Sequence, residues 1–130
     1  MNLISKILHT RLKFKEMERS LRFYIQVLGL KKVRSTVSPR GAKLVYLKVP
    51  EGEEELELTC FMNETGFNVP EDLMHIAFQV ENMKAFERHI SDFGIQFSDG
   101  PHVLSSGSII AFVNDPDGYE IELVQLPLKA

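Results

Sequence analysis

Two histidines and two glutamates stand at matching positions in the two halves of this 130-residue sequence, and all four could bind a metal ion. The interval from His9 to Glu57 differs by a single residue from the interval between His75 and Glu122. Imidazole and carboxylate groups are common ligands of divalent metals when they converge from separate elements. One such interval would be weak evidence, because glutamate is frequent in this chain. Two matching intervals predict one metal centre with four ligands.

These four residues belong to an internal repeat that covers most of the chain. One half of the sequence superposes on the other with one single-residue insertion or deletion. Each histidine is the second residue of a repeated first segment, and each glutamate is the third residue of a repeated last segment. The matched segments are residues 8–14 with 74–80, residues 44–47 with 109–112, and residues 55–59 with 120–124.

Each half has the pattern of a strand, a helix and three further strands. Apolar, β-branched and aromatic residues predict strands in the matched segments. The helices end at Gly29 and Gly94, where a C-terminal cap belongs, and turn residues around Gly52 and Gly118 precede the last strands. Apolar residues at helical spacing are Met17, Leu21, Tyr24, Ile25 and Leu28 in the first helix, and Met83, Phe86, Ile90 and Phe93 in the second.

This order of elements predicts an α+β fold of two tandem βαβββ modules. The modules would occupy about residues 5–62 and 73–126, and residues 63–72 would link them. A module with one helix leaves a face or an edge of its sheet to be covered. Two modules can meet this need by pairing. We therefore expect residues 1–130 to form one domain, in which a curved sheet encloses a metal cleft.

The last strand of each half presents its glutamates on the face opposite to its leucines. Glu55 and Glu57 share one face of the strand, whereas Leu56 and Leu58 share the other. The leucines can pack beneath the helix while Glu57 faces a cleft. The simpler interpretation of such a glutamate is a solvated carboxylate, which we favour for Glu55 and for its counterpart Glu120.

The charge and the hydropathy of the chain exclude several classes of function. The 15 basic and 18 acidic residues give a net charge of −3, which is not the footprint of a nucleic-acid-binding protein. No apolar run approaches the roughly 18 residues that cross a membrane, and the N-terminus lacks the features of a signal peptide. Cys60 is the only cysteine, which fits a reducing compartment. We therefore expect a cytoplasmic protein with neither a nucleic-acid partner nor a membrane partner.

Three other residues that could do chemistry are not assigned to the predicted site. Cys60 has no obvious base beside it in the sequence, and a lone strand cysteine is usually a small packing residue. His89 and His102 have no partner in the repeat, so we expect both on the solvated surface.

The sequence resembles the glyoxalase I (lactoylglutathione lyase) branch of the vicinal-oxygen-chelate superfamily over nearly its whole length. The Asp-Pro-Asp-Gly-Tyr phrase at residues 115–119 occurs across that superfamily. The His-Thr start at residues 9–10 combined with Glu-Leu-Thr at residues 57–59 is more specific to the lyase branch. Further likeness lies in residues 20–24, 27–30, 75–78 and 111–123.

The resemblance implies a metal and an assembly. Family enzymes hold a divalent ion on the residues that match His9, Glu57, His75 and Glu122, and water completes the coordination. Family members this short resemble the bacterial kind that prefers nickel or cobalt, whereas longer ones tend to use zinc. We therefore expect Ni²⁺, with Co²⁺ or Zn²⁺ as alternatives. The family is dimeric with active sites shared between chains, so we expect a homodimer of the same kind.

Three positions depart from the family pattern for the thiol cosubstrate. Lys13 stands where the family usually has an arginine that contacts a glutathione carboxylate, and lysine keeps the charge but loses the bidentate geometry. Phe61 stands where asparagine is common, and Glu71 where some members have arginine. By resemblance, Lys13 and Phe61 are the substrate-binding residues for glutathione or another low-molecular-weight thiol.

The activity that the resemblance implies is the isomerisation of a hemithioacetal, formed from methylglyoxal and a thiol, to an α-hydroxy thioester. A divalent metal stabilises the enediolate charge, and a carboxylate carries the proton between adjacent carbons. By resemblance Glu122 is this catalytic carboxylate, and Glu57 is its pseudo-symmetric counterpart. Two other functions stay open: another metal-dependent enzyme of the superfamily such as an epimerase, and a metal-free binding protein of the bleomycin-resistance type.

Overall fold

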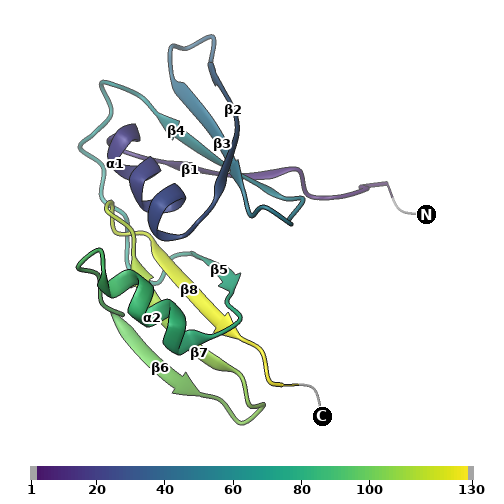
Figure 1. Ribbon diagram of the computed structural model, residues 1–130. Helices are drawn as coiled ribbons and strands as arrows, with labels where there is room; N and C mark the ends of the chain where they lie inside the picture. Colours follow the sequence, from purple (N-terminus) through teal and green to yellow (C-terminus); the bar gives the residue numbers. More distant parts are fainter. Residues whose placement is uncertain (1–2, 129–130) are drawn as a thin grey trace. The chain divides into compact units, whose positions relative to one another are not determined.

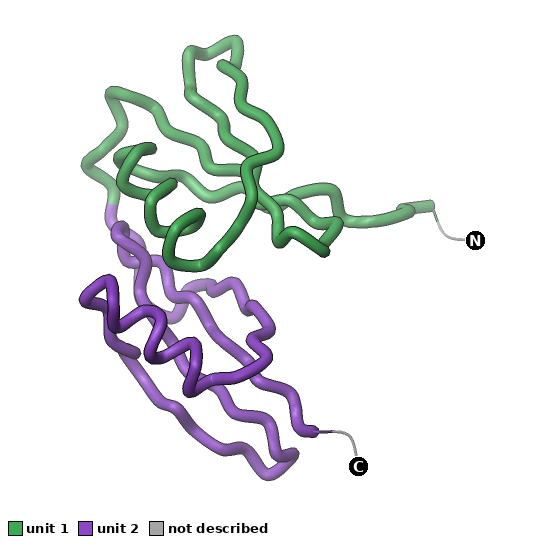
Figure 2. Tube along the Cα trace, viewed as in Figure 1, with its two compact units in different colours: residues 1–67 green, residues 68–130 purple. Residues whose placement is uncertain are grey.

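The computed structural model describes residues 3–128, and the chain divides into two compact units. Unit 1 ends at Phe67 and unit 2 begins at Asn68 (Figure 2). Each unit has its own sheet, so each is described by itself.

Unit 1 contains a strand, a helical segment and three further strands in chain order. Its sheet has the order β1-β4-β3-β2, in which β1 runs parallel to β4 and the other neighbours are antiparallel. Its elements are β1 (His9–Lys13), α1 (Met17–Leu21), η1 (Arg22–Val27), β2 (Lys31–Val37), β3 (Lys43–Lys48) and β4 (Glu55–Cys60).

Unit 2 repeats this order of elements. Its sheet has the order β5-β8-β7-β6, and β5 runs parallel to β8 (Figure 1). The predicted fold of two tandem βαβββ modules is therefore confirmed. The elements of unit 2 are β5 (His75–Gln79), α2 (Met83–Ser91), β6 (Asp99–Val103), β7 (Ile109–Asn114) and β8 (Glu120–Gln125).

The helical segments of the two units differ in their winding. In unit 1, α1 continues into the π-helical η1, where the Leu28 N–H donates to the Phe23 carbonyl five residues earlier at 3.0 Å. Phe23 and its neighbour Tyr24 are both buried there, with ring centroids 5.2 Å apart. In unit 2, α2 is regular, and the Asn82 side chain caps it by accepting from the Ala85 N–H at 2.9 Å.

Both helical segments are followed by a glycine with positive φ, as predicted. The φ angles of Gly29 and Gly94 are 81° and 74°, a conformation that favours glycine. The apolar spacing placed Phe93 in the second helix, and that assignment is wrong. Phe93 follows the last helical residue, Ser91, and is 45% exposed, because the chain is already turning toward Gly94. Its ring packs against His89, with centroids 5.3 Å apart.

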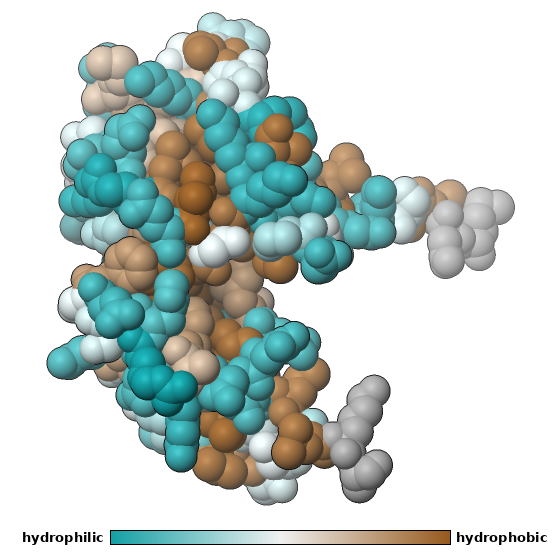
Figure 3. Space-filling view, viewed as in Figure 1, coloured by the Kyte–Doolittle hydropathy of each residue, from teal (hydrophilic) through white to brown (hydrophobic). Residues whose placement is uncertain are grey.

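Apolar side chains from one face of each sheet form the two cores. Leu56 and Leu58 of β4 are buried in unit 1, as the alternation predicted, and Ile121 and Leu123 of β8 are buried in unit 2. Cys60 is also buried in the first core, consistent with a packing role. Hydrophilic side chains cover the outer side of α2 (Figure 3). Within residues 3–128, no helix is long and apolar enough to span a membrane.

Candidate metal centre

The first histidine–glutamate pair lies in unit 1, where β1 and β4 are hydrogen-bonded neighbours. His9 is the first residue of β1 and Glu57 lies inside β4, and His9 Nε2 is 3.4 Å from Glu57 Oε1. Glu57 projects from the face opposite to Leu56 and Leu58. It is nevertheless only 5% exposed, because side chains from β1 and β3 surround it.

Three further side chains of unit 1 hold the Glu57 carboxylate. The Tyr46 hydroxyl on β3 donates to Oε1 at 2.9 Å. The Thr59 hydroxyl donates to Oε2 at 2.5 Å, and Arg11 Nε lies 3.1 Å from the same oxygen. Arg11 Nε also lies 2.9 Å from the Thr59 hydroxyl oxygen. With His9 included, each carboxylate oxygen of Glu57 has two polar neighbours.

These neighbours determine the protonation of Glu57. Burial acts to raise the pKa of Glu57, but the hydrogen bonds from Thr59 and Tyr46, with the charges of Arg11 and His9, hold that pKa below its usual value. The pKa of Tyr46 is raised, first by its hydrogen bond to Glu57 and then by burial. Glu57 is therefore ionised at neutral pH, which is the form that binds a metal.

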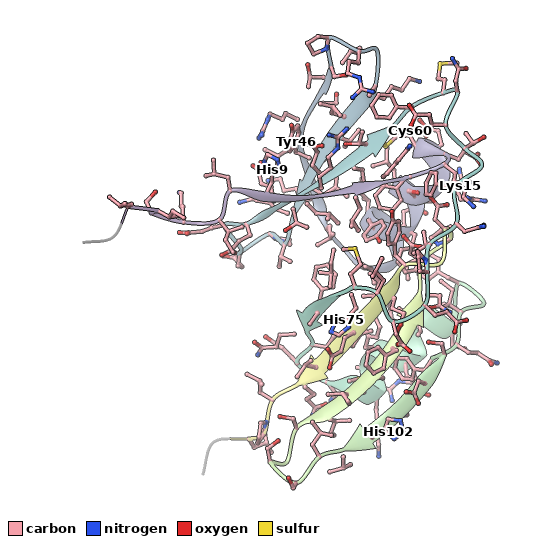
Figure 4. All side chains as sticks on the ribbon, turned by 180° about the vertical axis from the view of Figure 1, so that it is seen from behind. His9, Lys15, Tyr46, Cys60, His75 and His102 are labelled. Atoms are coloured by element: carbon pink, nitrogen blue, oxygen red, sulfur yellow. The ribbon has the colours of Figure 1, made fainter. Side chains whose placement is uncertain are left out.

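The second pair lies in unit 2 at the equivalent place between β5 and β8. His75 is the first residue of β5, and its Nε2 is 3.0 Å from Glu122 Oε1. The His75 ring packs edge-to-face on Phe112 with centroids 6.0 Å apart, as the His9 ring does on Tyr46 at 5.6 Å. Figure 4 shows His9 beside Tyr46 in unit 1, and His75 on β5 of unit 2.

The side chains around Glu122 are apolar, in contrast to those around Glu57. Ala77 and Phe112 are its Cα partners on the two neighbouring strands, and Val124 follows two residues later on the same face. None of these three side chains carries a hydrogen-bond donor. Among the described residues of unit 2, His75 provides the only polar side-chain contact to the Glu122 carboxylate.

The geometry of each pair suits a divalent ion. Two ligands that lie about 2.1 Å from one ion are about 3 Å apart when they meet at a right angle. The two nitrogen–oxygen distances of 3.4 and 3.0 Å match that separation. The structure brings His9 to Glu57 and His75 to Glu122, whereas residues 3–128 contain no group of three or more His, Cys, Asp or Glu side chains that could together hold a metal ion. Each pair is thus half of the predicted ligand set.

Lys13 and Phe61, the predicted thiol-contacting residues, lie in a group of cationic and aromatic side chains in unit 1. The Lys13 ammonium forms an ion pair with Glu64 and lies 5.6 Å from the Phe61 ring centroid. Arg11 and Arg40 face the same ring at 5.9 and 5.2 Å. Lys13 therefore already has a carboxylate partner within the protein, and its contact with a thiol stays a prediction.

Glu55, His89 and His102 were each expected to be solvated, and the structure shows their surroundings. Glu55 is half-buried and lies 3.0 Å from Arg34 Nη1, which corrects its interpretation as a solvated carboxylate. The Arg34 guanidinium in turn stacks 3.9 Å from the Tyr46 ring centroid. His89 and His102 are exposed, as expected.

Sequence reasoning did not identify Arg11 and Tyr46 as neighbours of Glu57. A signal was present in the repeat, because it aligns Arg11 with Ala77 and Tyr46 with Ala111. The strand register of the structure shifts the second match by one residue, and it is Phe112 that lies opposite Glu122 as Tyr46 lies opposite Glu57. A search for positions that are polar in one half and apolar in the other would have found both.

The chain is similar to several known proteins over most of its length. The sequence pattern of the Glyoxalase/Bleomycin resistance protein/Dioxygenase superfamily matches residues 6–123. The lactoylglutathione lyase of Salmonella typhimurium is 36% identical over 124 residues, which cover 92% of each chain. That of Escherichia coli O157:H7 is 35% identical with the same coverage. The solved structure of the trypanothione-dependent glyoxalase I of Leishmania major superposes with a TM-score of 0.78 at 32% identity, over 94% of this chain and 87% of that one.

Proposed function

Because this chain belongs to the glyoxalase/bleomycin resistance protein/dioxygenase superfamily, we propose that it is a metal-dependent lactoylglutathione lyase. It converts the hemithioacetal of methylglyoxal and a thiol to an α-hydroxy thioester. The observation that carries the proposal is the His–Glu contact that recurs in the same register in both units. The lactoylglutathione lyases that are 36% and 35% identical support it.

The proposed metal ligands are His9, Glu57, His75 and Glu122. When bound, a divalent ion supplies Lewis-acid stabilisation of the enediolate charge. We favour Ni²⁺, with Co²⁺ or Zn²⁺ as alternatives, because the chain resembles the short bacterial members of the family. Two imidazoles and two carboxylates are compatible with all three ions.

Glu122 is the proposed catalytic carboxylate. It takes the proton from one carbon of the hemithioacetal and returns it to the adjacent carbon. Its surroundings support this role, because a turn of the carboxylate breaks only its contact with His75, whereas Ala77 and Phe112 offer it no hydrogen bond. Glu57 is its pseudo-symmetric counterpart, and the donors around it suit an ionised ligand better than a proton carrier.

The proposed assembly is a homodimer with shared active sites. Each site would take His9 and Glu57 from one chain and His75 and Glu122 from the other. The presence of one pair in each unit supports this arrangement. A mixture of inactive His9→Ala and Glu122→Ala proteins should regain activity after subunit exchange, because one site of the hybrid keeps all four ligands. A mixture that stays inactive although mass spectrometry detects the hybrid would contradict shared sites.

The proposed cosubstrate is glutathione or another low-molecular-weight thiol, with Lys13 and Phe61 as contacts. A free thiol persists in a reducing compartment, so we also propose a cytoplasmic location. The single buried cysteine, Cys60, is compatible with that compartment.

The proposed activity is tested by following thioester formation from methylglyoxal and each of several thiols. The protein loaded with Ni²⁺ should form the thioester, and the protein treated with a chelator should not. A metal-loaded protein that isomerises no hemithioacetal with any thiol would contradict the lyase activity and favour an epimerase.

A further inference from the structure

The donors that surround Glu57 have no assigned role in the proposed reaction. Arg11 on β1 and Tyr46 on β3 are the Cα partners of Glu57 on its two neighbouring strands. They reach different carboxylate oxygens, since Arg11 Nε is 3.1 Å from Oε2 and the Tyr46 hydroxyl is 2.9 Å from Oε1. A rotation of the carboxylate would therefore break contacts on both sides.

Tyr46 is itself held in place. The Arg34 guanidinium lies 3.9 Å from the centroid of its ring, and Glu55 anchors that guanidinium at 3.0 Å. The His9 ring packs edge-to-face against Tyr46 at 5.6 Å, and Tyr46 is only 9% exposed. Its hydroxyl therefore has little freedom to leave Glu57.

The equivalent positions around Glu122 keep the shape but not the donors. Phe112 retains the aromatic ring of Tyr46 and its edge-to-face contact with histidine, but it lacks the hydroxyl. Ala77 stands where unit 1 has Arg11 and lacks the guanidinium. Packing alone would be satisfied by a phenyl ring in both units. The additional polar groups of unit 1 are directed at the carboxylate.

We propose that Arg11 and Tyr46 are positioning residues, which fix Glu57 as a permanent metal ligand and leave proton transfer to Glu122. This inference rests on the proposed function, because it concerns the same metal centre. A buried carboxylate that turned away from its donors would leave polar groups unpaired, which is costly. Glu57 would therefore keep one orientation as a ligand of the bound ion, whereas Glu122 would be free to turn toward the substrate. The two modules thereby divide ligation and proton transfer between them.

The first test replaces each positioning residue with its counterpart from unit 2. The Tyr46→Phe/Arg11→Ala protein should bind Ni²⁺ about 10- to 100-fold more weakly than the wild type in titration calorimetry without substrate. Tyr46→Phe alone is nearly isosteric, and it should show a smaller loss in the same direction. Arg22→Ala is the control for the lost positive charge, because Arg22 is exposed on η1. The Ni²⁺ affinity of this variant should equal that of the wild type. An unchanged Ni²⁺ affinity in both Tyr46 variants would overturn the proposal.

The reciprocal test adds a donor beside Glu122. Phe112→Tyr adds a hydroxyl opposite Glu122, at the place in unit 2 that is equivalent to that of Tyr46 opposite Glu57 in unit 1. The hydroxyl should restrain Glu122, so kcat should fall about tenfold or more while Ni²⁺ affinity is kept or increased. Phe97→Tyr is the control, because Phe97 is half-buried in unit 2 but lies outside β7. A Phe112→Tyr protein with wild-type kcat would overturn the division of roles.

The two measurements separate this proposal from the proposed function. Calorimetry needs no turnover, so the positioning role is decided even if the wild type isomerises no hemithioacetal. Suppose that the wild type is active and that both Tyr46 variants bind Ni²⁺ as tightly as the wild type. That result would support the lyase activity and contradict the positioning role.

Discussion

The histidine–glutamate pairs of unit 1 and unit 2 share strand order, register and ring packing, but the polarity around the two glutamates differs. The Glu57 side chain is 7% exposed, and its carboxylate is held by donors from β1, β3 and β4. The Glu122 side chain is 17% exposed, and apart from His75 its partners on the adjacent strands, Ala77 and Phe112, are apolar. The repeated backbone determines where the two carboxylates lie. The side chains on the neighbouring strands determine how freely each carboxylate can move.

The largest expected effect comes from replacing each glutamate by its amide. Glu122→Gln should lower kcat about 10²- to 10⁴-fold, because an amide cannot accept the proton. Its Ni²⁺ affinity should fall less, since the amide oxygen can still coordinate. Glu57→Gln should instead lose mainly Ni²⁺ affinity, because the amide nitrogen would face the donors of Tyr46 or Arg11.

Steady-state kinetics and titration calorimetry on both proteins check this pair of substitutions. Similar losses of kcat and of affinity in the two variants would remove the distinction between the two carboxylates.

Much of the fold was predictable from the sequence, because the repeat aligns strands, caps and turns in two independent copies. Leu56 and Leu58 alternate with Glu57, and this period of two was sufficient to place the leucines in the core. It did not show that Glu57, on the opposite face of β4, is buried as well. The π-helical winding of η1 was not predictable, since its apolar spacing also fits an α-helix. The position of Phe93 beyond the end of α2 was missed, because helical spacing does not show where the last turn ends.

The candidate site was predictable only in part. The repeat identified each His–Glu pair, and within each pair the structure places the histidine in contact with its glutamate. The donors around Glu57 depend on which residue of β3 faces which residue of β4, and spacing alone does not fix that register. The ion pair between Lys13 and Glu64 was also missed. Glu64 lies in the loop after β4, and no strand pattern in the sequence fixes where a loop residue lies.

A smaller effect is expected on the acid stability of the metal-free protein. The pKa of Glu57 is lower in the folded chain than its usual value of about 4.3. Ionised Glu57 therefore contributes stability above that value, and the contribution is lost as pH falls through the lower folded pKa. Tyr46→Phe should reduce the free energy of unfolding by about 1–2 kcal/mol at pH 7 and by less in acid.

Urea unfolding of the two proteins between pH 7 and pH about 3 measures this difference. A stability difference that stayed constant over the whole range would show that Tyr46 does not act through the ionised carboxylate.

The smallest effect is expected at the thiol-contacting residues of unit 1. Lys13→Arg with Phe61→Asn should lower the KM for the glutathione adduct by about twofold to tenfold, because a bidentate cation and an amide replace groups that recognise the thiol poorly. Glu64→Gln should act in the same direction, since it releases Lys13 from its ion pair. Metal content, measured in the same preparations, should not change. A KM that rises or stays constant in both variants would place thiol recognition elsewhere.

The most direct test of the account is the number of Ni²⁺ ions bound per chain, measured by calorimetry and elemental analysis on the wild type, His9→Ala and His75→Ala. If the two pairs together form one ligand set, the wild type binds one ion per chain, and either substitution removes tight binding. Two ions per chain in the wild type, or one ion retained after either histidine is lost, would show that the pairs are separate sites and would contradict the account.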